Sequence, residues 1–221
     1  MRQLSFAVTA LVLVAACDSP TAPTQSATPK AVPTEASPIL GLFNGLLPSK
    51  YKVGVHAVAL SANVLGIVAK AGEAGPTGPG GGSESNSALT ISIPKTLWTS
   101  VLNGEVWANQ FHSYAASSVD ELKLDLLGIN IYATVLAAKS GAGCGGDLPW
   151  GNSTIAKLYI NGKAIDITGQ PNQTISLGLV KIVINEQQPY YNGLRVRALH
   201  VVALGVADVI VAEAAAPLFY C

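Results

Sequence analysis

The sequence predicts an all-β fold, an antiparallel β-sandwich whose strands are joined by hairpin connections. Short runs with alternating apolar side chains, such as ALTISI at 88–93, are typical of strands with one buried face. The dipeptide Asn-Gly, which favours two-residue hairpin turns, occurs at 44–45, 103–104, 161–162 and 192–193. Only 12% of the residues are charged, and this composition is closer to that of an exported β-protein than to that of a cytosolic enzyme.

The first residues have the features of an export signal. Arg2 supplies a positive charge, and an apolar run from Leu4 to Ala16 follows it. A helix that crosses a bilayer needs about 20 apolar residues, so this run is too short to span but suits a signal peptide. We therefore expect residues 1–16 to form the helix of a lipoprotein signal peptide.

The end of that run indicates a lipid anchor. Val14, Ala15 and Ala16 stand directly before Cys17. This order resembles the lipobox of bacterial lipoproteins, whose cysteine carries diacylglycerol and becomes the first mature residue. We expect lipidation at Cys17, with two or more acyl chains because one chain anchors only marginally. The alternative is an ordinary secretory signal followed by a chance cysteine.

A tether follows the cysteine. Residues 18–38 contain five prolines among many Thr, Ser and Ala residues. Such a segment buries too little apolar surface to fold, so residues 17–38 are expected to be the lipidated cysteine and a disordered stalk biased to polyproline II. Anchor and stalk together predict a protein of the bacterial cell envelope, on its periplasmic or extracellular face.

Residues 39–221 are expected to form a single sandwich domain. The Gly- and Ser-rich stretch at 72–87 is interpreted as a mobile loop within this domain, and a division into two domains at this stretch is the alternative. Asn-Gly at 103–104 predicts a hairpin that joins 97–102 to 105–110, although the first of these segments could also form a short helix.

Further strands are expected at 157–167, 180–187 and 194–202, whose composition and length are typical of strands. The turn at 161–162 would place Ile160 opposite Lys163. The nearly apolar segment 201–219 is expected to form one or two core strands.

A membrane helix is the alternative for that last segment. Asp208, Glu213 and Pro217 lie inside it, and a carboxylate is costly at the centre of a membrane helix. The lipid is therefore expected to be the only anchor.

The sequence contains no pattern typical of catalysis. His56, His112 and His200 lie far from one another and from the cysteines, so no zinc-binding spacing is present. Motifs of serine hydrolases, nucleotide-binding loops and calcium loops are also missing. Thirteen basic residues balance thirteen acidic ones, which gives no reason to expect nucleic acid. We expect a protein that is not an enzyme and has no cofactor or metal.

Aromatic residues offer one kind of binding surface. Trp98, Trp107, Trp150, Tyr190 and Tyr191 could stack on sugars, or they could pack in the core and in hairpins. Trp150, Tyr190 and Tyr191 lie next to turn sequences and are expected to be the most exposed. They form the candidate ligand surface.

The three cysteines suggest one disulfide. Lipidation uses Cys17, and the two that remain, Cys144 and Cys221, would then share an oxidising compartment in which disulfides persist. Cys144 lies in a glycine-rich loop that can adapt to the geometry of a bridge. Two unpaired thiols are the alternative.

Several segments together carry a resemblance to a family. They are SSVDELKLDLLGINIYATVLAA (117–138), Cys144, STIAKLYINGKAIDI (153–167), IVINEQ (182–187), RALHV (197–201), ADVIVAEA (207–214) and Cys221. In their order and spacing they resemble the choice-of-anchor P proteins of bacteria. The resemblance implies an exported domain that is attached to cells by different devices, and it implies no established activity. It marks Asn185, Glu186 and His200 as recurrent positions without giving them a role.

These observations predict a lipid-anchored protein of the bacterial surface or envelope with a structural or adhesive role. The alternative is a carbohydrate-binding module that uses exposed Trp and Tyr side chains. Expected partners are the membrane, through the lipid, and an envelope polysaccharide or another surface protein. Three exposed coplanar aromatic rings along one face would favour the module, and a deep pocket with His200, Glu186 and another acid would favour an enzyme.

Overall fold

A computed structural model describes residues 54–78, 80–145 and 149–218. These residues belong to one compact unit and form twelve strands and no helix, so the predicted all-β class is confirmed. None of the described residues forms a helix long and apolar enough to cross a membrane. The expected signal peptide, Cys17 and the stalk lie outside the described residues.

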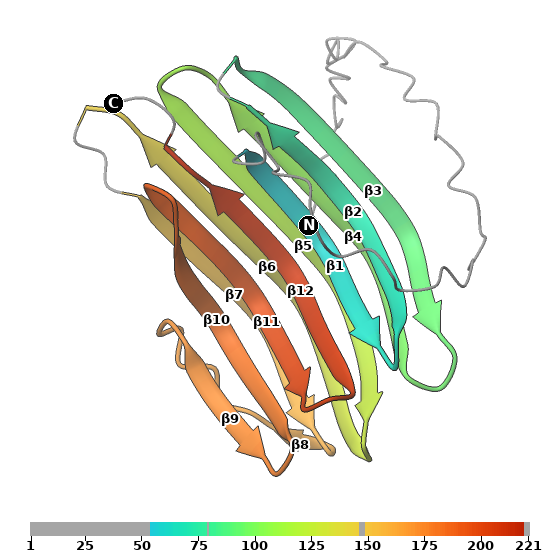
Figure 1. The fold of residues 1–221 in the computed structure, drawn as a ribbon. Coiled ribbons are helices and arrows are strands. Elements are labelled where there is room, and N and C mark those ends of the chain that lie inside the picture. The colour runs from blue at the N-terminus through green and yellow to red at the C-terminus, as the bar shows by residue number, and fades with distance from the viewer. Residues whose placement is uncertain (1–53, 79, 146–148, 219–221) are drawn as a thin grey trace, which may run out of the picture. The chain divides into compact units, whose positions relative to one another are not determined.

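Two antiparallel sheets of six strands each face one another (Figure 1), as the predicted sandwich requires. Sheet A has the strand order β2-β1-β12-β11-β10-β9. Its strands, in that order, are Ile67–Thr77, Val55–Val64, Ala207–Ala216, Gly193–Ala203, Val180–Tyr190 and Gln173–Leu177.

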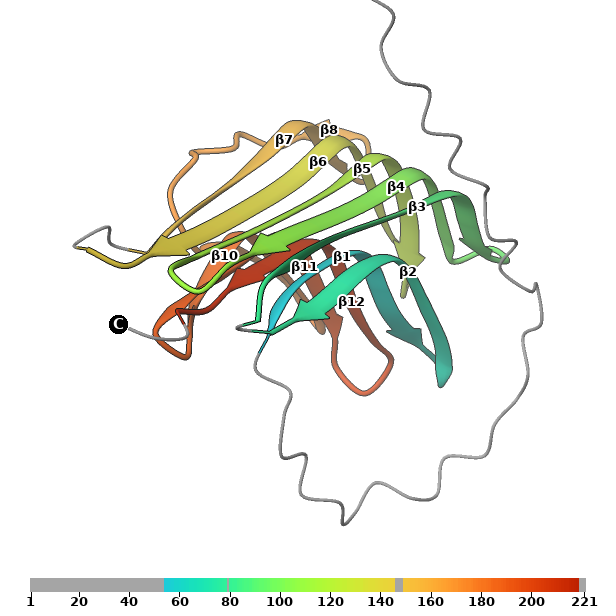
Figure 2. The ribbon, with the colours of Figure 1, turned by 90° about the horizontal axis from the view of Figure 1, so that it is seen from above.

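Sheet B has the strand order β3-β4-β5-β6-β7-β8, so each strand pairs with the next along the chain. Its strands are Gly82–Ile93, Leu97–Ala108, His112–Leu126, Ile129–Gly143, Trp150–Ile160 and Lys163–Ala164. Figure 2 shows the two sheets as separate layers.

The core lies between the two layers. β12 packs against β5 and β6, and β11 packs against β6 and β7. Leu102, Leu122 and Leu136 of sheet B and Leu60 and Leu199 of sheet A are fully buried in one cluster. Apolar area removed from water in this way is the main stabilising contribution to such a fold, and it leaves the outer face of each sheet for other roles.

Several strand predictions are confirmed. Asn161 and Gly162 form the turn between β7 and β8, and Ile160 pairs with Lys163 as expected. Both turn residues have positive φ, 51° and 76°, as the favoured hairpin turn requires. The segment 201–219 supplies the end of β11 and all of β12, so it contributes core strands as predicted.

The prediction of a mobile loop at 72–87 is wrong. β2 runs to Thr77 and β3 begins at Gly82, so the two strands include most of this stretch. A Cβ atom on Gly72 would lie 2.7 Å from Cβ of Ala59. Glycine is therefore used here for close packing, and composition alone does not separate this use from flexibility.

The predicted hairpin at 103–104 is also wrong, as is the alternative helix before it. Asn103 and Gly104 lie inside β4, paired with Ser118 and Ser117 of β5. A Cβ atom on Gly104 would lie 2.2 Å from the carbonyl oxygen of Gly72. Gly104 allows β2 to pass close to β4, and the tertiary contact overrides the local turn preference of Asn-Gly.

A crease crosses each sheet at mid-height. Along it, residues on alternate strands have positive φ: Val101 and Val135 in sheet B, and Gly72, Ala212 and Asn185 in sheet A. The regular pairing skips one residue on each strand at this line. Ser100 pairs with Glu121 and Leu102 pairs with Val119, and Val101 has no partner between them.

At the crease, the alternation between side chains that face the core and side chains that face outward shifts by one residue. In a regular strand, residues an odd number of positions apart point to opposite faces. Trp98 and Trp107 are nine positions apart on β4, yet neither belongs to the core, and the buried neighbours Leu97, Val106 and Ala108 lie on the opposite side. One outer face therefore carries aromatic residues at both ends of the same strand.

Candidate functional site

The outer face of sheet B carries a row of aromatic residues. Trp107 of β4 pairs with Tyr114 of β5, Tyr114 pairs with Gly141 of β6, and Gly141 pairs with Trp150 of β7. Four adjacent strands thus place three rings and one glycine on a single line across the sheet. We call Trp107, Tyr114 and Trp150 the aromatic row.

Gly141 brings the rings of the row together. A Cβ atom at this position would lie 2.6 Å from ring atoms of Trp150, so the indole lies over the glycine. As a result the ring centroids of Tyr114 and Trp150 are 6.3 Å apart although β6 separates their strands, and the rings are tilted by 43°. This tilt is close to the twist expected over two strand spacings of a sheet, about 45°.

The row is open to solvent. Trp107 and Trp150 are 44% and 46% exposed. A shallow groove of about 620 Å³ follows the row and is lined by Trp107, His112, Ser113, Tyr114, Gly141, Ala142, Gly143 and Trp150. Large exposed rings in a groove are typical of a surface that binds a ligand.

Polar side chains lie beside the row. Glu105, Lys139 and Asn152 are exposed and stand two positions from row residues on β4, β6 and β7, so they share the outer face. Burial raises the pKa of the Tyr114 hydroxyl, and the charge of Glu105 and its hydrogen bond raise it further. Tyr114 therefore stays neutral at neutral pH, and the groove combines apolar rings with donors and acceptors.

A second aromatic group lies at the other end of the same face. Trp98, Lys123, Tyr132 and Tyr159 pair in succession across β4, β5, β6 and β7. The ammonium of Lys123 lies 4.6 Å from the ring centroid of Trp98, and the rings of Tyr132 and Tyr159 are 6.1 Å apart. In this group Lys123 has the place on β5 that Tyr114 has in the aromatic row.

The expected ligand surface of Trp150, Tyr190 and Tyr191 is divided between the sheets. Trp150 begins β7 of sheet B, whereas Tyr190 ends β10 of sheet A and Tyr191 follows in the turn. Tyr191 is exposed, but Tyr190 is buried, contrary to expectation. Its ring packs edge-on against His56 and Tyr191 and under the guanidinium of Arg195.

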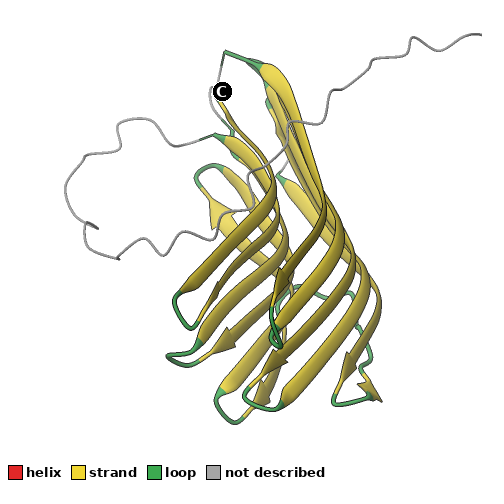
Figure 3. Cartoon of the chain, turned by 90° about the vertical axis from the view of Figure 1, so that its right-hand side faces the viewer, coloured by secondary structure: helices red, strands yellow, loops and turns green. Residues whose placement is uncertain are grey.

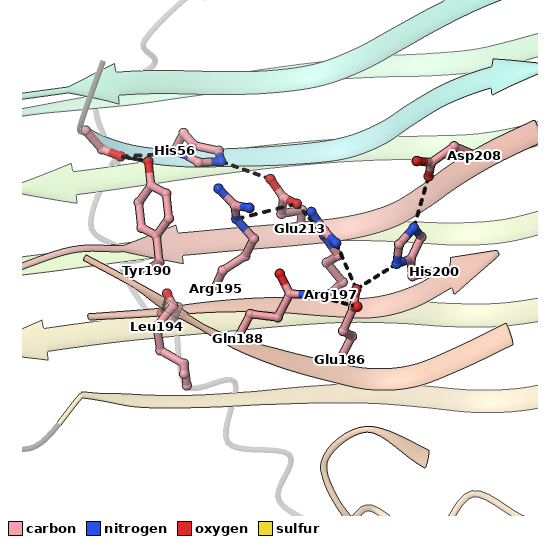
Figure 4. A network of polar contacts seen from close by, with 12 residues as sticks. His56, Glu186, Gln188, Tyr190, Leu194, Arg195, Arg197, His200, Asp208 and Glu213 are labelled. Carbon is pink, nitrogen blue, oxygen red and sulfur yellow. Dashed lines mark hydrogen bonds and ion pairs between the residues drawn. The ribbon is translucent and has the colours of Figure 1, made fainter. Parts of the chain in front are cut away.

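The outer face of sheet A carries a chain of charged residues, which we call the charged ladder (Figure 4). Its members, in order of contact, are His56, Glu213, Arg197, Glu186, His200 and Asp208. Glu186, Arg197 and Glu213 lie directly opposite one another on β10, β11 and β12. Opposite charges at such positions stabilise the pairing of strands.

Arg197 links the two glutamates. Its Nε donates to Oε2 of Glu213 at 2.6 Å, and its Nη1 donates to Oε2 of Glu186 at 2.9 Å. Nε2 of Gln188 donates to the other oxygen of Glu186 at 2.8 Å. Each buried carboxylate therefore has several charged or polar partners, which a buried charge requires.

These contacts set the charge of the ladder. Burial alone would raise the pKa of Glu213, but the hydrogen bond with His56 and the charge of Arg197 outweigh it and lower this pKa to about 2. Burial is likewise outweighed at Glu186, where Arg197 and His200 hold the pKa below its usual value. The two carboxylates raise the pKa of Arg197 despite its burial. All three groups are charged at neutral pH.

His200 lies between two carboxylates. Its Nδ1 is 2.8 Å from Oε2 of Glu186, and its Nε2 is 3.0 Å from Oδ1 of Asp208. Both ring nitrogens therefore already have a carboxylate partner.

The ladder gathers His200, Glu186 and another acid, the set that would favour an enzyme if it lined a deep pocket. Each of these groups already has a hydrogen-bond partner within the ladder, however, and a general base or nucleophile must be able to reach a substrate. No group of three or more His, Cys, Asp or Glu side chains suited to a metal occurs in the described part of the chain. The arrangement matches a set of ion pairs that fixes the register of three strands.

Sequence reasoning found only part of these sites. The resemblance marked Glu186 and His200, and the structure places both in the ladder. Asn185 lies at the crease, where its side-chain Nδ2 donates to the carbonyl of Gly169 at 3.1 Å. Tyr114 was missed, although a short turn after Trp107 would have indicated that the two residues pair across a hairpin.

The remaining predicted sites lie at the edge of the described residues or outside them. Cys144 follows β6, and its amide donates to the carbonyl of Phe111 at 2.9 Å. Cys221 and Cys17 lie outside the described residues, so the Cys144–Cys221 bridge and the lipidation stay predictions.

Comparisons of the chain with known proteins found no significant match. No protein-family model matches the chain, and neither a curated protein nor a solved structure shows significant similarity to it. Membership of the choice-of-anchor P family stays a prediction.

Proposed function

We propose that this protein is a bacterial envelope lipoprotein, and that its sandwich binds a carbohydrate through the aromatic row. It would thus act as an adhesive surface protein without enzymatic activity, whose partner is an envelope polysaccharide. The observation that carries the proposal is the alignment of Trp107, Tyr114 and Trp150 on one exposed face. The lipobox-like sequence that ends at Cys17 supports the anchor.

The chemistry of the row suits sugars. The faces of a pyranose ring present C–H groups, which stack on aromatic rings, and its hydroxyls need donors and acceptors at the rim. Three strand spacings separate β4 from β7, so the row spans about 14 Å. That length accommodates a short oligosaccharide lying across the strands, with Glu105, Lys139 and Asn152 beside it.

The tilt between the rings bears on the shape of the ligand. Tyr114 and Trp150 are inclined by 43° to one another. A flat, crystalline polysaccharide surface would contact only one of them face-on. A soluble chain that turns between successive sugars can stack on both, and we expect such a chain as the ligand.

Binding of the full-length protein to an array of bacterial polysaccharides tests the proposal. We expect saturable binding that is lost in Trp107→Ala and in Trp150→Ala. Tyr191→Ala removes an exposed ring from sheet A and serves as the matched control, with binding unchanged. Absence of binding to any polysaccharide, or binding that survives both tryptophan substitutions, would contradict the carbohydrate proposal.

The anchor has a separate test. In cells fed an alkyne-labelled fatty acid, the wild-type protein should incorporate the label and fractionate with membranes. Cys17→Ser should do neither. If Cys17→Ser is labelled like the wild type, the anchor lies elsewhere, whatever the outcome of the carbohydrate experiment.

A further inference from the structure

Six hairpin turns lie together at one end of the sandwich, the lower end in Figures 1 and 3. Backbone hydrogen bonds link neighbouring turns, from Leu65 to Val206 and from Leu204 to Leu179, and link a turn to the end of the next strand, from Asp125 to Thr96 and from Asn161 to Asn130. We call this end the turn end. The turns comprise residues 65–66, 94–96, 127–128, 161–162, 178–179 and 204–206.

Four of these six turns carry an exposed leucine. Leu65 and Leu204 are 73% and 72% exposed, and Leu127 and Leu179 are also exposed. Val68, close to the first turn, is exposed as well. Turns in water usually carry Asn, Asp, Ser or Gly, and several exposed apolar residues in one place are typical of an interaction surface.

The backbone of two turns makes this choice of residue costly. Leu65 and Leu127 have φ of 52° and 54°, and the glycine after each also has positive φ. Asn161 occupies the equivalent position of a third turn with φ of 51°. Asparagine adopts this conformation readily and leucine does not. At two equivalent turns the chain thus has a leucine that is unfavourable both for its conformation and for its exposure.

Two backbone amides of the turns that carry leucine already have hydrogen-bond partners. The amide of Leu65 donates to the carbonyl of Val206 at 2.9 Å, and the amide of Leu204 donates to the carbonyl of Leu179 at 3.0 Å. Adjacent turns satisfy one another's polar groups in this way. An amide that is already paired does not lose a hydrogen bond when water is removed from it.

The charged residues at the turn end favour binding to a negatively charged surface. None of the fourteen turn residues is acidic, and Lys95 is the one charged residue among them. Lys163 directly follows the turn of Asn161 and Gly162. The nearest carboxylates, Asp125 and Asp208, lie two positions back from the turns, and Asp208 is held by His200 at 3.0 Å.

We propose that the turn end docks on a lipid bilayer, with the leucines among the acyl chains and the lysines at anionic headgroups. Apolar side chains beside lysines bind anionic interfaces in this way. The leucine turns of sheet A are two strands apart, about 10 Å from one another. Separate apolar points of this kind suit a soft lipid surface, whereas a second copy of the chain would need a continuous complementary face.

This inference rests on the proposed anchor, which keeps the domain at a membrane. The described chain enters β1 at the end of the sandwich opposite to the turn end. The 21 residues of the predicted stalk, 18–38, could extend to about 65 Å. The strands of 10–15 residues are about 35–50 Å long, so a stalk of this length allows the leucines to reach the bilayer.

A photo-crosslinking residue tests the contact. The full-length lipidated protein, with benzoylphenylalanine in place of Leu204, is reconstituted into vesicles of phosphatidylethanolamine and phosphatidylglycerol, floated and irradiated. We expect adducts with lipid. The same probe in place of Leu89, which is exposed on the edge strand β3, should give none and is the matched control.

A variant distinguishes insertion of the leucines into the bilayer from a domain that is only held near the bilayer by its anchor. In a chain with Leu65→Asn, Leu127→Asn and Leu179→Asn, the yield of lipid adduct at position 204 should fall by at least about tenfold, because each inserted leucine contributes to docking. Leu89→Asn should leave the yield unchanged. Vesicles of phosphatidylcholine alone should give a lower yield than anionic vesicles.

The other outcomes overturn the inference. Adducts with a second copy of the chain at position 204 would identify a self-association surface. Protein that floats with the vesicles but gives no lipid adduct would exclude docking while leaving the anchor intact. Protein that does not float would contradict both the anchor and the docking.

Discussion

The indole of Trp150 lies directly over Gly141, its cross-strand neighbour, and the absence of a side chain at Gly141 positions the aromatic row. A Cβ atom there would lie 2.6 Å from Trp150 ring atoms. The glycine is thus part of the candidate binding surface although it offers no group to a ligand. Glycine in the interior of a strand often marks such a close approach.

Gly141→Ala should therefore weaken carbohydrate binding without unfolding the sheet. The added methyl displaces the exposed indole and separates it from Tyr114, so affinity should fall several-fold, while the free energy of unfolding changes by less than about 1 kcal/mol. Calorimetric titration and urea unfolding measure the two effects. Thr154→Ala, on the same face of β7, should leave affinity unchanged. Equal affinity of Gly141→Ala and wild type would show that binding does not depend on the position of the Trp150 ring.

Arg197 should be the most sensitive residue of the charged ladder. Arg197→Met leaves the buried carboxylates of Glu186 and Glu213 without their shared guanidinium, and we expect a loss of about 3 kcal/mol in the free energy of unfolding. Arg195 is 3.9 Å from Glu213, so Arg195→Met should cost less. Adding Glu186→Gln and Glu213→Gln to Arg197→Met should restore part of the loss, because the unpaired charges are gone.

The ladder also predicts how stability depends on pH. Glu213 has a pKa of about 2 in the folded protein against an ordinary value of 4.5. A lowered pKa means that the folded state binds fewer protons, so this contribution is fully present above about pH 4.5 and is lost as the pH falls towards 2. Urea unfolding over this interval measures it. In Glu213→Gln the fall should be shallower, and an unchanged slope would contradict the assignment.

Local signals predicted the class of fold because they are properties of short segments. The strand at ALTISI and the turn at Asn161 and Gly162 depend only on neighbouring residues. The errors arose where residues distant in sequence decide the local structure. Gly72 and Gly104 are in contact with one another. Because of this packing, the chain forms continuous strands where the sequence predicted a loop and a hairpin.

The candidate sites were harder to predict, for the same reason. Trp107, Tyr114 and Trp150 form a row only because the registers of β4 to β7 align them. The crease at Val101 and Val135 breaks the two-residue period, so the face on which a side chain lies cannot be counted along the strand. The sequence named Trp107 and Trp150 as possible sugar-stacking residues, and the resemblance marked Glu186 and His200, but neither indicated Tyr114 or the ladder partners.

The disulfide between Cys144 and Cys221 has a direct test. The bridge would close a loop of just under 80 residues, for which loop entropy gives about 4.5 kcal/mol as an upper value. Denatured, unreduced mature protein should then contain no reactive thiol, and Cys221→Ser should lower the melting temperature by several degrees. Two reactive thiols per chain would rule out the bridge.

Leu65 and Leu127 should lower the free energy of unfolding of the protein. Leu65 and Leu127 have the backbone conformation of Asn161, in which asparagine is more favourable than leucine. Leu65→Asn and Leu127→Asn should each raise the free energy of unfolding by about 0.5–1 kcal/mol, measured in urea for the protein in detergent. Leu204 has no positive φ, so Leu204→Asn, which changes the same side chain without the conformational gain, should have a smaller effect. If the first two substitutions destabilise the protein, the leucines make contacts within the sandwich that their exposure does not suggest, and a docking role would no longer be needed to explain them.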